Sequence, residues 1–112
     1  MSESPLDVLM GTIADRKATR PPDSYTTRLF DGGVERIGRK VAEEAAEVVE
    51  AAGEPGETGR AHLLYEAGDL VYHLFVMLAA RDLTLADLEG EIARRFGVSG
   101  LAEKASRGKP PA

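Results

Sequence analysis

Apolar side chains recur at intervals of three and four residues along most of the chain, which is the spacing of one face of an α-helix. The segment 34–52 shows this most clearly, because its apolar positions step by three or four throughout. These positions are Val34, Ile37, Val41, Ala45, Val48 and Ala52. The spacing predicts a long amphipathic helix with one face turned toward a core.

Helix-capping and helix-breaking residues set the bounds of the other elements. Ser4 followed by Pro5 is typical of a helix start, and Pro21-Pro22 is typical of a helix end. Thr84 and Asp87 have the spacing of a capping box. Because β-branched alternation is absent from the sequence, we predict an all-α fold. The predicted elements are helices over 5–19, 34–52, 58–82 and 85–96 and a short turn over 25–30 that ends at Asp31-Gly32-Gly33.

The predicted helix over 58–82 is apolar on nearly every side. Such a helix is buried, and this one carries more apolar surface than its neighbours in a chain of 112 residues can cover. We therefore expect a single domain over 1–112, in which a bundle of four to five helices is completed by homodimerisation. Its core spans about 5–96 and its C-terminal tail spans 97–112. A monomeric helical bundle is the alternative.

Composition narrows the classes of function. Apolar residues make up 43% of the chain and charged residues 29%, as in a folded soluble domain. The longest apolar run, 74–80, is far shorter than the ~20 residues of a membrane-spanning helix. No secretory signal opens the chain, and we expect no membrane partner. The absence of cysteine excludes thiolate chemistry, and a net charge of −5 makes nucleic acid an unfavourable partner.

Acidic residues are unevenly distributed around the first long helix. At about 100° per residue, Lys40, Glu44 and Glu47 form one line along the edge of its apolar face. Glu43 and Glu50 point away from the core, where we expect ordinary solvated ion pairs. Glu44 and Glu47 are therefore the candidates for a site at the edge of the core.

The second long helix repeats this arrangement. One polar stripe interrupts its apolar surface and contains His62, Glu66, Asp69 and His73. Glu66 and Asp69 are three residues apart, so their carboxylates project to the same side. A half-buried pair of carboxylates is costly unless a cation neutralises it.

Two antiparallel helices that each present two carboxylates would surround one cavity with four acids. Oxygen ligands without cysteine favour a hard cation, and Mg²⁺ or Mn²⁺ at a phosphate substrate is the usual chemistry. Solvated helical faces are the structural alternative. A di-iron centre requires Glu-x-x-His on two helices, and neither His62 nor His73 completes that pattern.

Motifs around these acids resemble those of a known family. Glu43-Glu44-x-x-Glu47 followed by Glu66-x-x-Asp69 is similar to the signature of the MazG-like all-α nucleotide pyrophosphohydrolases. Within that superfamily the chain resembles the phosphoribosyl-ATP pyrophosphohydrolases over most of residues 6–107. The motifs that carry this resemblance are Ser24-Tyr25-Thr26, Leu29-Phe30, Gly33-Val34-Glu35-Arg36-Ile37, Lys40-Val41-x-Glu43-Glu44, Tyr65-Glu66-Ala67-x-Asp69-Leu70-x-Tyr72-His73-Leu74, Arg94-Arg95-Phe96-Gly97 and Ser99-Gly100-Leu101-x-Glu103-Lys104.

The resemblance implies the second step of histidine biosynthesis, in which phosphoribosyl-ATP and water give phosphoribosyl-AMP and pyrophosphate. It also implies a cytoplasmic homodimer with Mg²⁺ as its cofactor, for which Mn²⁺ would substitute. By position, the implied Mg²⁺ ligands are Glu44, Glu47, Glu66 and Asp69. Glu47 or Glu43 would accept the proton from the attacking water, and the helical projection favours Glu47.

Other residues are candidates for contacts with the substrate. Lys40 lies on the line of Glu44 and is a candidate phosphate contact, with a lysine that extends along the surface as the alternative. The alternative for Tyr72 is an ordinary tyrosine of the core, and the alternative for the tail is a solvated segment. His73 is more typical of a group that orients a carboxylate by a hydrogen bond than of a metal ligand. Candidate contacts with base, ribose or phosphate are Tyr25, Thr26, Arg28, Tyr72, His73 and, in the tail, Lys104.

Two other functions fit the same acidic pattern. A MazG-like pyrophosphohydrolase acting on another nucleoside triphosphate shares it, but generic members lack the segments Ser24-Tyr25-Thr26 and 99–104. A non-catalytic helical dimerisation module would carry the acids as a solvated face. That module predicts no effect of divalent cations on thermal stability, whereas a four-carboxylate site predicts stabilisation by Mg²⁺.

Overall fold

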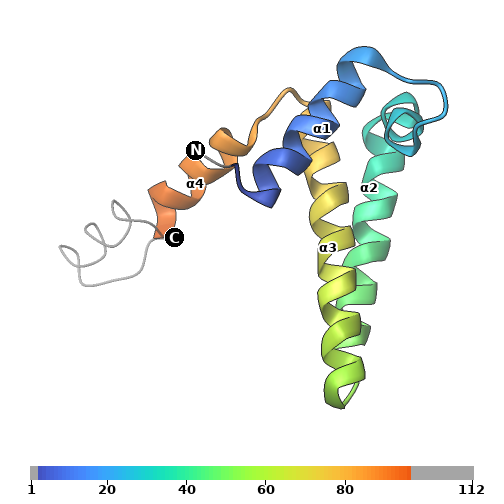
Figure 1. Ribbon diagram of the computed structural model, residues 1–112, viewed down its shortest axis with the longest axis vertical. Helices are drawn as coiled ribbons and strands as arrows, with labels where there is room; N and C mark the ends of the chain where they lie inside the picture. The colour runs from blue at the N-terminus through green and yellow to red at the C-terminus, as the bar shows by residue number, and fades with distance from the viewer. Residues whose placement is uncertain (1–2, 97–112) are drawn as a thin grey trace. The chain divides into compact units, whose positions relative to one another are not determined.

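The computed structural model describes residues 3–96, and within this range the chain forms four α-helices and no strand (Figure 1). The helices are α1 (Pro5–Thr19), α2 (Tyr25–Ala52), α3 (Gly56–Ala80) and α4 (Leu85–Phe96). The predicted all-α class is confirmed. Helices α1 to α3 belong to one compact unit that ends at Asp82, and α4 belongs to a second unit that begins at Leu83. The predicted tail, with Lys104, lies outside the described residues.

A reciprocal capping box begins α1 at Ser4, where the sequence predicts the helix start. The Asp7 N–H donates to Ser4 Oγ at 3.2 Å, and the Ser4 N–H donates to the Asp7 carboxylate at 3.1 Å. Near the other end of α1, Lys17 Nζ donates to the Ala79 carbonyl at 2.8 Å and to the Asp82 carboxylate at 2.6 Å. These bonds fasten α1 to the C-terminal end of α3, where the last carbonyls of a helix lack intrahelical partners.

Gly33 divides α2 into two helical segments, which confirms the predicted break. Its φ of 72° and ψ of −174° lie in a region that glycine alone adopts readily. Ser24 caps the first segment, since its Oγ accepts a hydrogen bond from the Thr27 N–H at 3.3 Å. Both segments contribute to the core, because Leu29 before the kink and Ile37 after it are fully buried.

Helices α2 and α3 run antiparallel and side by side, joined by a tight turn (Figure 1). Gly59 makes this turn possible, because a Cβ at its position would lie 2.2 Å from the carbonyl oxygen of Glu54. Residue 54 therefore folds back onto the first turn of α3. The helix begins at Gly56 rather than at the predicted Thr58, since the φ of 71° at Gly56 completes the turn earlier.

The apolar core lies where α1 packs against the hairpin of α2 and α3 (Figure 1). The largest fully buried side chains come from all three helices and are Ile13, Leu29, Ile37 and Val76. Burial of each such side chain stabilises the fold by about 1.5–3 kcal/mol. Toward the turn the hairpin consists of α2 and α3 alone, and the buried residues there include two acids, Glu44 and Glu66.

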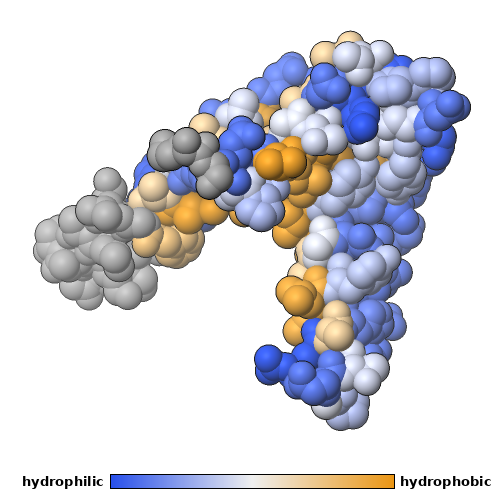
Figure 2. Space-filling view, in the orientation of Figure 1, coloured by the Kyte–Doolittle hydropathy of each residue, from blue (hydrophilic) through white to orange (hydrophobic). Residues whose placement is uncertain are grey.

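Helix α3 leaves much of its apolar surface open to solvent in the single chain. Leu64 and Tyr65 are 76% and 68% exposed, and Figure 2 shows hydrophobic side chains along the side of α3 that faces away from α2. Among the described helices, α3 is the one long and apolar enough to cross a membrane. The core helix of a helical bundle has the same property, and Glu66 and Asp69 within α3 would be costly in lipid.

Candidate metal centre

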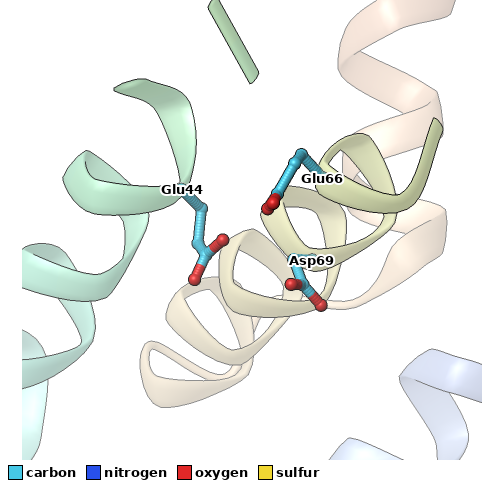
Figure 3. A group of neighbouring side chains, drawn as sticks. All are labelled: Glu44, Glu66 and Asp69. Atoms are coloured by element: carbon cyan, nitrogen blue, oxygen red, sulfur yellow. The ribbon is translucent and has the colours of Figure 1, made fainter. Parts of the chain in front are cut away.

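Three acidic side chains converge between α2 and α3 (Figure 3). Glu44 comes from α2, whereas Glu66 and Asp69 come from successive turns of α3. One carboxylate oxygen of each residue lies within 4.8 Å of the other two. Glu44 and Glu66 are only 6% and 7% exposed, and Asp69 is half-buried. The i, i+3 spacing on α3 and the antiparallel pairing with α2 together produce the cluster.

Two carboxylate oxygens of the cluster lack a hydrogen-bond partner among the described residues. They are Glu44 Oε2 and Glu66 Oε1, and both are buried. Buried polar atoms are normally hydrogen-bonded, and buried charges are paired or coordinate metals, because an unpaired buried charge is costly. Carboxylate oxygens are also the ligands that Mg²⁺ and Mn²⁺ prefer. The residues present therefore fit a hard divalent cation.

The carboxylates of the cluster carry like charges and repel one another. Burial raises the pKa of Glu44 above its usual value, and the carboxylates of Glu47 and Asp69 raise it further. His73 and Lys40 lower the pKa of Glu44 and so oppose these effects. A divalent cation among the carboxylates would favour their ionised forms, because an opposite charge at close range stabilises the charged state.

Lys40 lies at the edge of the cluster, as its i, i+4 spacing from Glu44 predicts. Its Nζ is 3.7 Å from Glu44 Oε1 and donates a hydrogen bond to Glu43 at 3.1 Å. The hydrogen bond to Glu43 raises the pKa of Lys40, so the ammonium group stays charged. One positive charge faces three carboxylates, so Lys40 offsets only part of their charge.

Three other predicted site residues are exposed to solvent. Glu47 lies one helical turn beyond Glu44 and is not part of the cluster, although it is one of the four ligands that the family resemblance implies. Glu43 points to solvent and pairs with Lys40. Arg28 is exposed on the first segment of α2. The structure therefore brings together three of the four predicted ligands.

Polar aromatic residues link the start of α2 to α3. Tyr25 Oη lies 3.0 Å from His73 Nε2, and His73 Nδ1 lies 2.8 Å from the Asp69 carbonyl. Because a carbonyl only accepts, His73 Nδ1 carries a hydrogen and donates it to the Asp69 carbonyl, which leaves Nε2 to pair with the Tyr25 hydroxyl. His73 thus binds the main-chain oxygen of Asp69, whereas its place in the predicted polar stripe indicated a hydrogen bond to a carboxylate. Thr26 Oγ1 and Tyr72 Oη form the second link.

A second histidine of α3 contacts the cluster from the side of the turn. His62 Nε2 lies 3.0 Å from Glu66 Oε2, and His62 Nδ1 lies 2.9 Å from Glu54 Oε1. Both contacts raise the pKa of His62, and the contact with Glu54 has the larger effect. His62 belongs to the polar stripe that the sequence predicts on α3, whereas no pattern in the sequence indicated Glu54. The one signal in the sequence was the i, i+4 spacing of His62 and Glu66.

A helical hairpin that brings three carboxylates together, two of them with a buried oxygen that lacks a partner among the described residues, defines a candidate centre for the kind of divalent cation that metal-dependent phosphate hydrolases use. The family model for phosphoribosyl-ATP pyrophosphohydrolase matches residues 6–96. The chain therefore belongs to the phosphoribosyl-ATP pyrophosphohydrolase family.

Curated relatives are similar over nearly the whole chain. The phosphoribosyl-ATP pyrophosphatase of Rhodopirellula baltica is 58% identical over 103 residues, which cover 92% of this chain and 86% of that protein. The enzyme of Rhodobacter capsulatus is 48% identical over 92% of this chain and 97% of its own length. That of Geobacter sulfurreducens is 46% identical over 91% and 92%, respectively. The sequence motifs indicated a hydrolase of phosphoribosyl-ATP in histidine biosynthesis, and this assignment is confirmed.

Proposed function

We propose that the chain hydrolyses the α–β phosphoanhydride bond of phosphoribosyl-ATP with Mg²⁺ held by Glu44, Glu66 and Asp69, and that Mn²⁺ substitutes for Mg²⁺. The observation that most supports this proposal is the pair of buried oxygens without hydrogen-bond partners among the described residues, Glu44 Oε2 and Glu66 Oε1. Membership of the family supplies the substrate.

Each acid has a proposed role. Glu44, Glu66 and Asp69 hold the cation from the interior of the hairpin, and Glu47 is the proposed fourth ligand from the solvent side. When bound, the cation neutralises phosphate charge and polarises the bond that is cleaved. Glu47 is also the favoured acceptor for the proton of the attacking water, because it is exposed near the cluster. Glu43 is the second choice, since its carboxylate already accepts a hydrogen bond from Lys40.

Positively charged and aromatic residues are the proposed substrate contacts. Lys40 and Arg28 would contact phosphates, as would Lys104 from outside the described residues. Tyr25 is 39% exposed, and its ring stacks on that of Tyr72 with centroids 6.2 Å apart and planes 24° apart. This aromatic pair offers an apolar surface to the base or ribose.

The hydroxyls of the aromatic pair are held by hydrogen bonds across the two helices. His73 holds the hydroxyl of Tyr25, and Thr26 holds that of Tyr72. Burial raises the pKa of Tyr72, so its hydroxyl remains protonated at neutral pH. His73 and Thr26 are therefore proposed to act on the substrate through the position of the two tyrosine rings.

We also propose that the protein acts as a cytoplasmic homodimer in which α3 is covered by the partner. Only 28% of the most apolar window of α3 is buried within the single chain, and exposed apolar patches of this kind usually mark an interface. Light scattering should give twice the chain mass of 12.0 kDa. Leu64→Glu on α3 should favour the monomer, whereas Val8→Glu, at an exposed apolar position of α1, should not. A wild-type monomer at high micromolar concentration would contradict the dimer.

The function is tested by incubating the protein with phosphoribosyl-ATP and Mg²⁺ and following the products by phosphorus NMR. We expect equimolar phosphoribosyl-AMP and pyrophosphate, loss of turnover on chelation, and recovery with Mg²⁺ or Mn²⁺. Orthophosphate as the first product would overturn the assigned bond. Faster turnover of a deoxynucleoside triphosphate would overturn the substrate, and full turnover by Glu44→Gln would overturn the metal ligands.

A further inference from the structure

The contact between His62 and Glu66 distinguishes the two oxygens of a buried carboxylate. Glu66 Oε2 lies 3.0 Å from His62 Nε2, whereas Glu66 Oε1 is buried and has no hydrogen-bond partner among the described residues. A carboxylate that is held by one oxygen keeps the direction of the other, because rotation would break the hydrogen bond. His62 therefore leaves Oε1 as the oxygen of Glu66 that is available to a cation.

His62 is itself held from its other side. Its Nδ1 lies 2.9 Å from Glu54 Oε1, and Glu54 belongs to the turn that Gly59 allows to fold back onto α3. The side chains of Glu54 and His62 are 44% and 40% exposed, whereas that of Glu66 is 10% exposed. The contacts thus run from the surface of the turn, through an imidazole, to a buried acid.

We propose that Glu54 and His62 are positioning residues that fix the carboxylate of Glu66, so that the affinity of the centre for its divalent cation depends on the α2–α3 turn. This inference rests on the proposed metal centre and extends it beyond the acids themselves. Hydrogen-bonding partners of metal ligands commonly have this effect, since they restrict the ligand to the orientation that the metal requires.

The charges of the pair suit this role. Glu54 lies 2.9 Å from the ring nitrogen opposite the one that faces Glu66, so a carboxylate stands on each side of the imidazole. An exposed ion pair contributes little to stability in water, because solvent screens it. The effect of Glu54 and His62 should therefore appear in cation affinity and much less in folding.

The test is a Mn²⁺ titration of the full chain, with free Mn²⁺ measured by electron paramagnetic resonance. His62→Ala should weaken Mn²⁺ binding about tenfold, the lower end of the 10–100-fold range for partners of metal ligands. Glu54→Ala should weaken it to a smaller extent. Glu54→Gln should restore binding, because an amide of the same length donates or accepts at the imidazole. The double variant His62→Ala/Glu54→Ala should match His62→Ala alone, since Glu54 acts through His62.

Glu57→Ala is the matched control. Glu57 also lies near the turn and carries one negative charge, but it pairs with Arg60 at 3.3 Å, so its removal should leave Mn²⁺ affinity unchanged. Alanine at position 62 favours the helix, and circular dichroism should show unchanged helix content. In turnover, His62→Ala should raise the Mg²⁺ concentration needed for half-maximal activity, with kcat at saturating Mg²⁺ nearly unchanged.

The outcomes separate this inference from the metal centre. Wild-type Mn²⁺ affinity in His62→Ala would overturn the positioning role and leave the centre intact. Equal losses of Mn²⁺ affinity in Glu54→Ala and Glu57→Ala would mean that only the overall negative charge near the turn matters. That result would also overturn the positioning role. If Glu44→Gln binds Mn²⁺ as tightly as the wild type, the proposed centre fails, and the role of His62 fails with it.

Discussion

Glu44→Gln should stabilise the metal-free protein and at the same time remove its response to Mg²⁺. Glu44 is 6% exposed, and one of its oxygens lies within 4.8 Å of oxygens of Glu66 and Asp69. Glutamine keeps the size of the side chain, removes its charge, and supplies an amide N–H that can donate to a neighbouring carboxylate. In the absence of a cation the glutamate therefore costs stability.

The size of this effect follows from the geometry of the cluster. Two unit charges 4.8 Å apart repel by about 3.5 kcal/mol at an effective dielectric constant of about 20. Glu66 and Asp69 both lie within this distance, so their repulsion of Glu44 sums to about 7 kcal/mol. Lys40, 3.7 Å from Glu44, opposes it by about 4.5 kcal/mol in the same estimate, and partial protonation of Glu44 offsets more. We expect a net gain of about 1–2 kcal/mol at neutral pH, which corresponds to about 5–10 °C in Tm for a small domain.

The gain should depend on pH with a definite sign. The pKa of Glu44 is raised from its ordinary value of 4.5, so between 4.5 and the raised pKa the folded protein binds more protons than the unfolded one. The stability that this bound proton contributes to the metal-free wild type is therefore lost as the pH rises from 4.5 through the raised pKa. The Tm advantage of Glu44→Gln should be smallest below pH 4.5 and should grow toward neutral pH.

The assay is thermal unfolding in chelator and in Mg²⁺. The wild type should gain about 2.7 kcal/mol at a Mg²⁺ concentration of 100 times the Kd, whereas Glu44→Gln should gain almost nothing. Glu50→Gln, at an exposed position of the same helix, should stay within about 0.5 kcal/mol of the wild type and keep the Mg²⁺ response. The reasoning is refuted if metal-free Glu44→Gln is less stable than the wild type, or if it keeps the full Mg²⁺ response.

Two further variants test hydrogen bonds that join the helices. Tyr72→Phe leaves the buried Thr26 hydroxyl without its partner and should lower the free energy of unfolding by about 1–2 kcal/mol in urea titrations; unchanged stability would contradict the hydrogen bond. Lys17→Met removes the bond to the Ala79 carbonyl and should cost about 1 kcal/mol at neutral pH. Because Lys17 lowers the pKa of Asp82 from 3.8, the deficit should shrink as the pH falls through that lowered pKa, and a constant deficit would exclude the ion pair.

The helices could be predicted because their signals are local in the sequence. Ser4 and the Thr84–Asp87 pair form the caps that their spacing predicts. Gly33, before Val34, produces the kink in α2. The start of α3 was less predictable, since it depends on the conformation of Gly56 and on the approach of Glu54 to the helix.

The acids at the site were partly predictable from helical projection. The angle around the helix identifies Glu44 and Glu66 as residues at the edge of the core, and both are buried. The angle does not tell how deeply a side chain is buried, because burial depends on which helix packs alongside. Glu47 is accordingly exposed, although it lies on the same line as Glu44.

Contacts between distant segments could not be predicted from the sequence. Tyr25 meets His73, and Glu54 meets His62, only because the hairpin and its turn bring them together. Periodicity describes each helix alone and contains no information about such pairs. The hydrogen bonds that order the site therefore required the structure.

The most direct test of the metal-dependent centre is the rate of pyrophosphate release from phosphoribosyl-ATP by the wild type and by Asp69→Asn at saturating Mg²⁺. Asparagine keeps the shape of the side chain and removes the charge of one ligand, so the folded variant should lose at least about 100-fold in kcat/KM, or about 2.7 kcal/mol of transition-state stabilisation. Wild-type turnover that persists in chelator, or an Asp69→Asn variant as fast as the wild type, would contradict the assignment of the cluster as the catalytic metal centre.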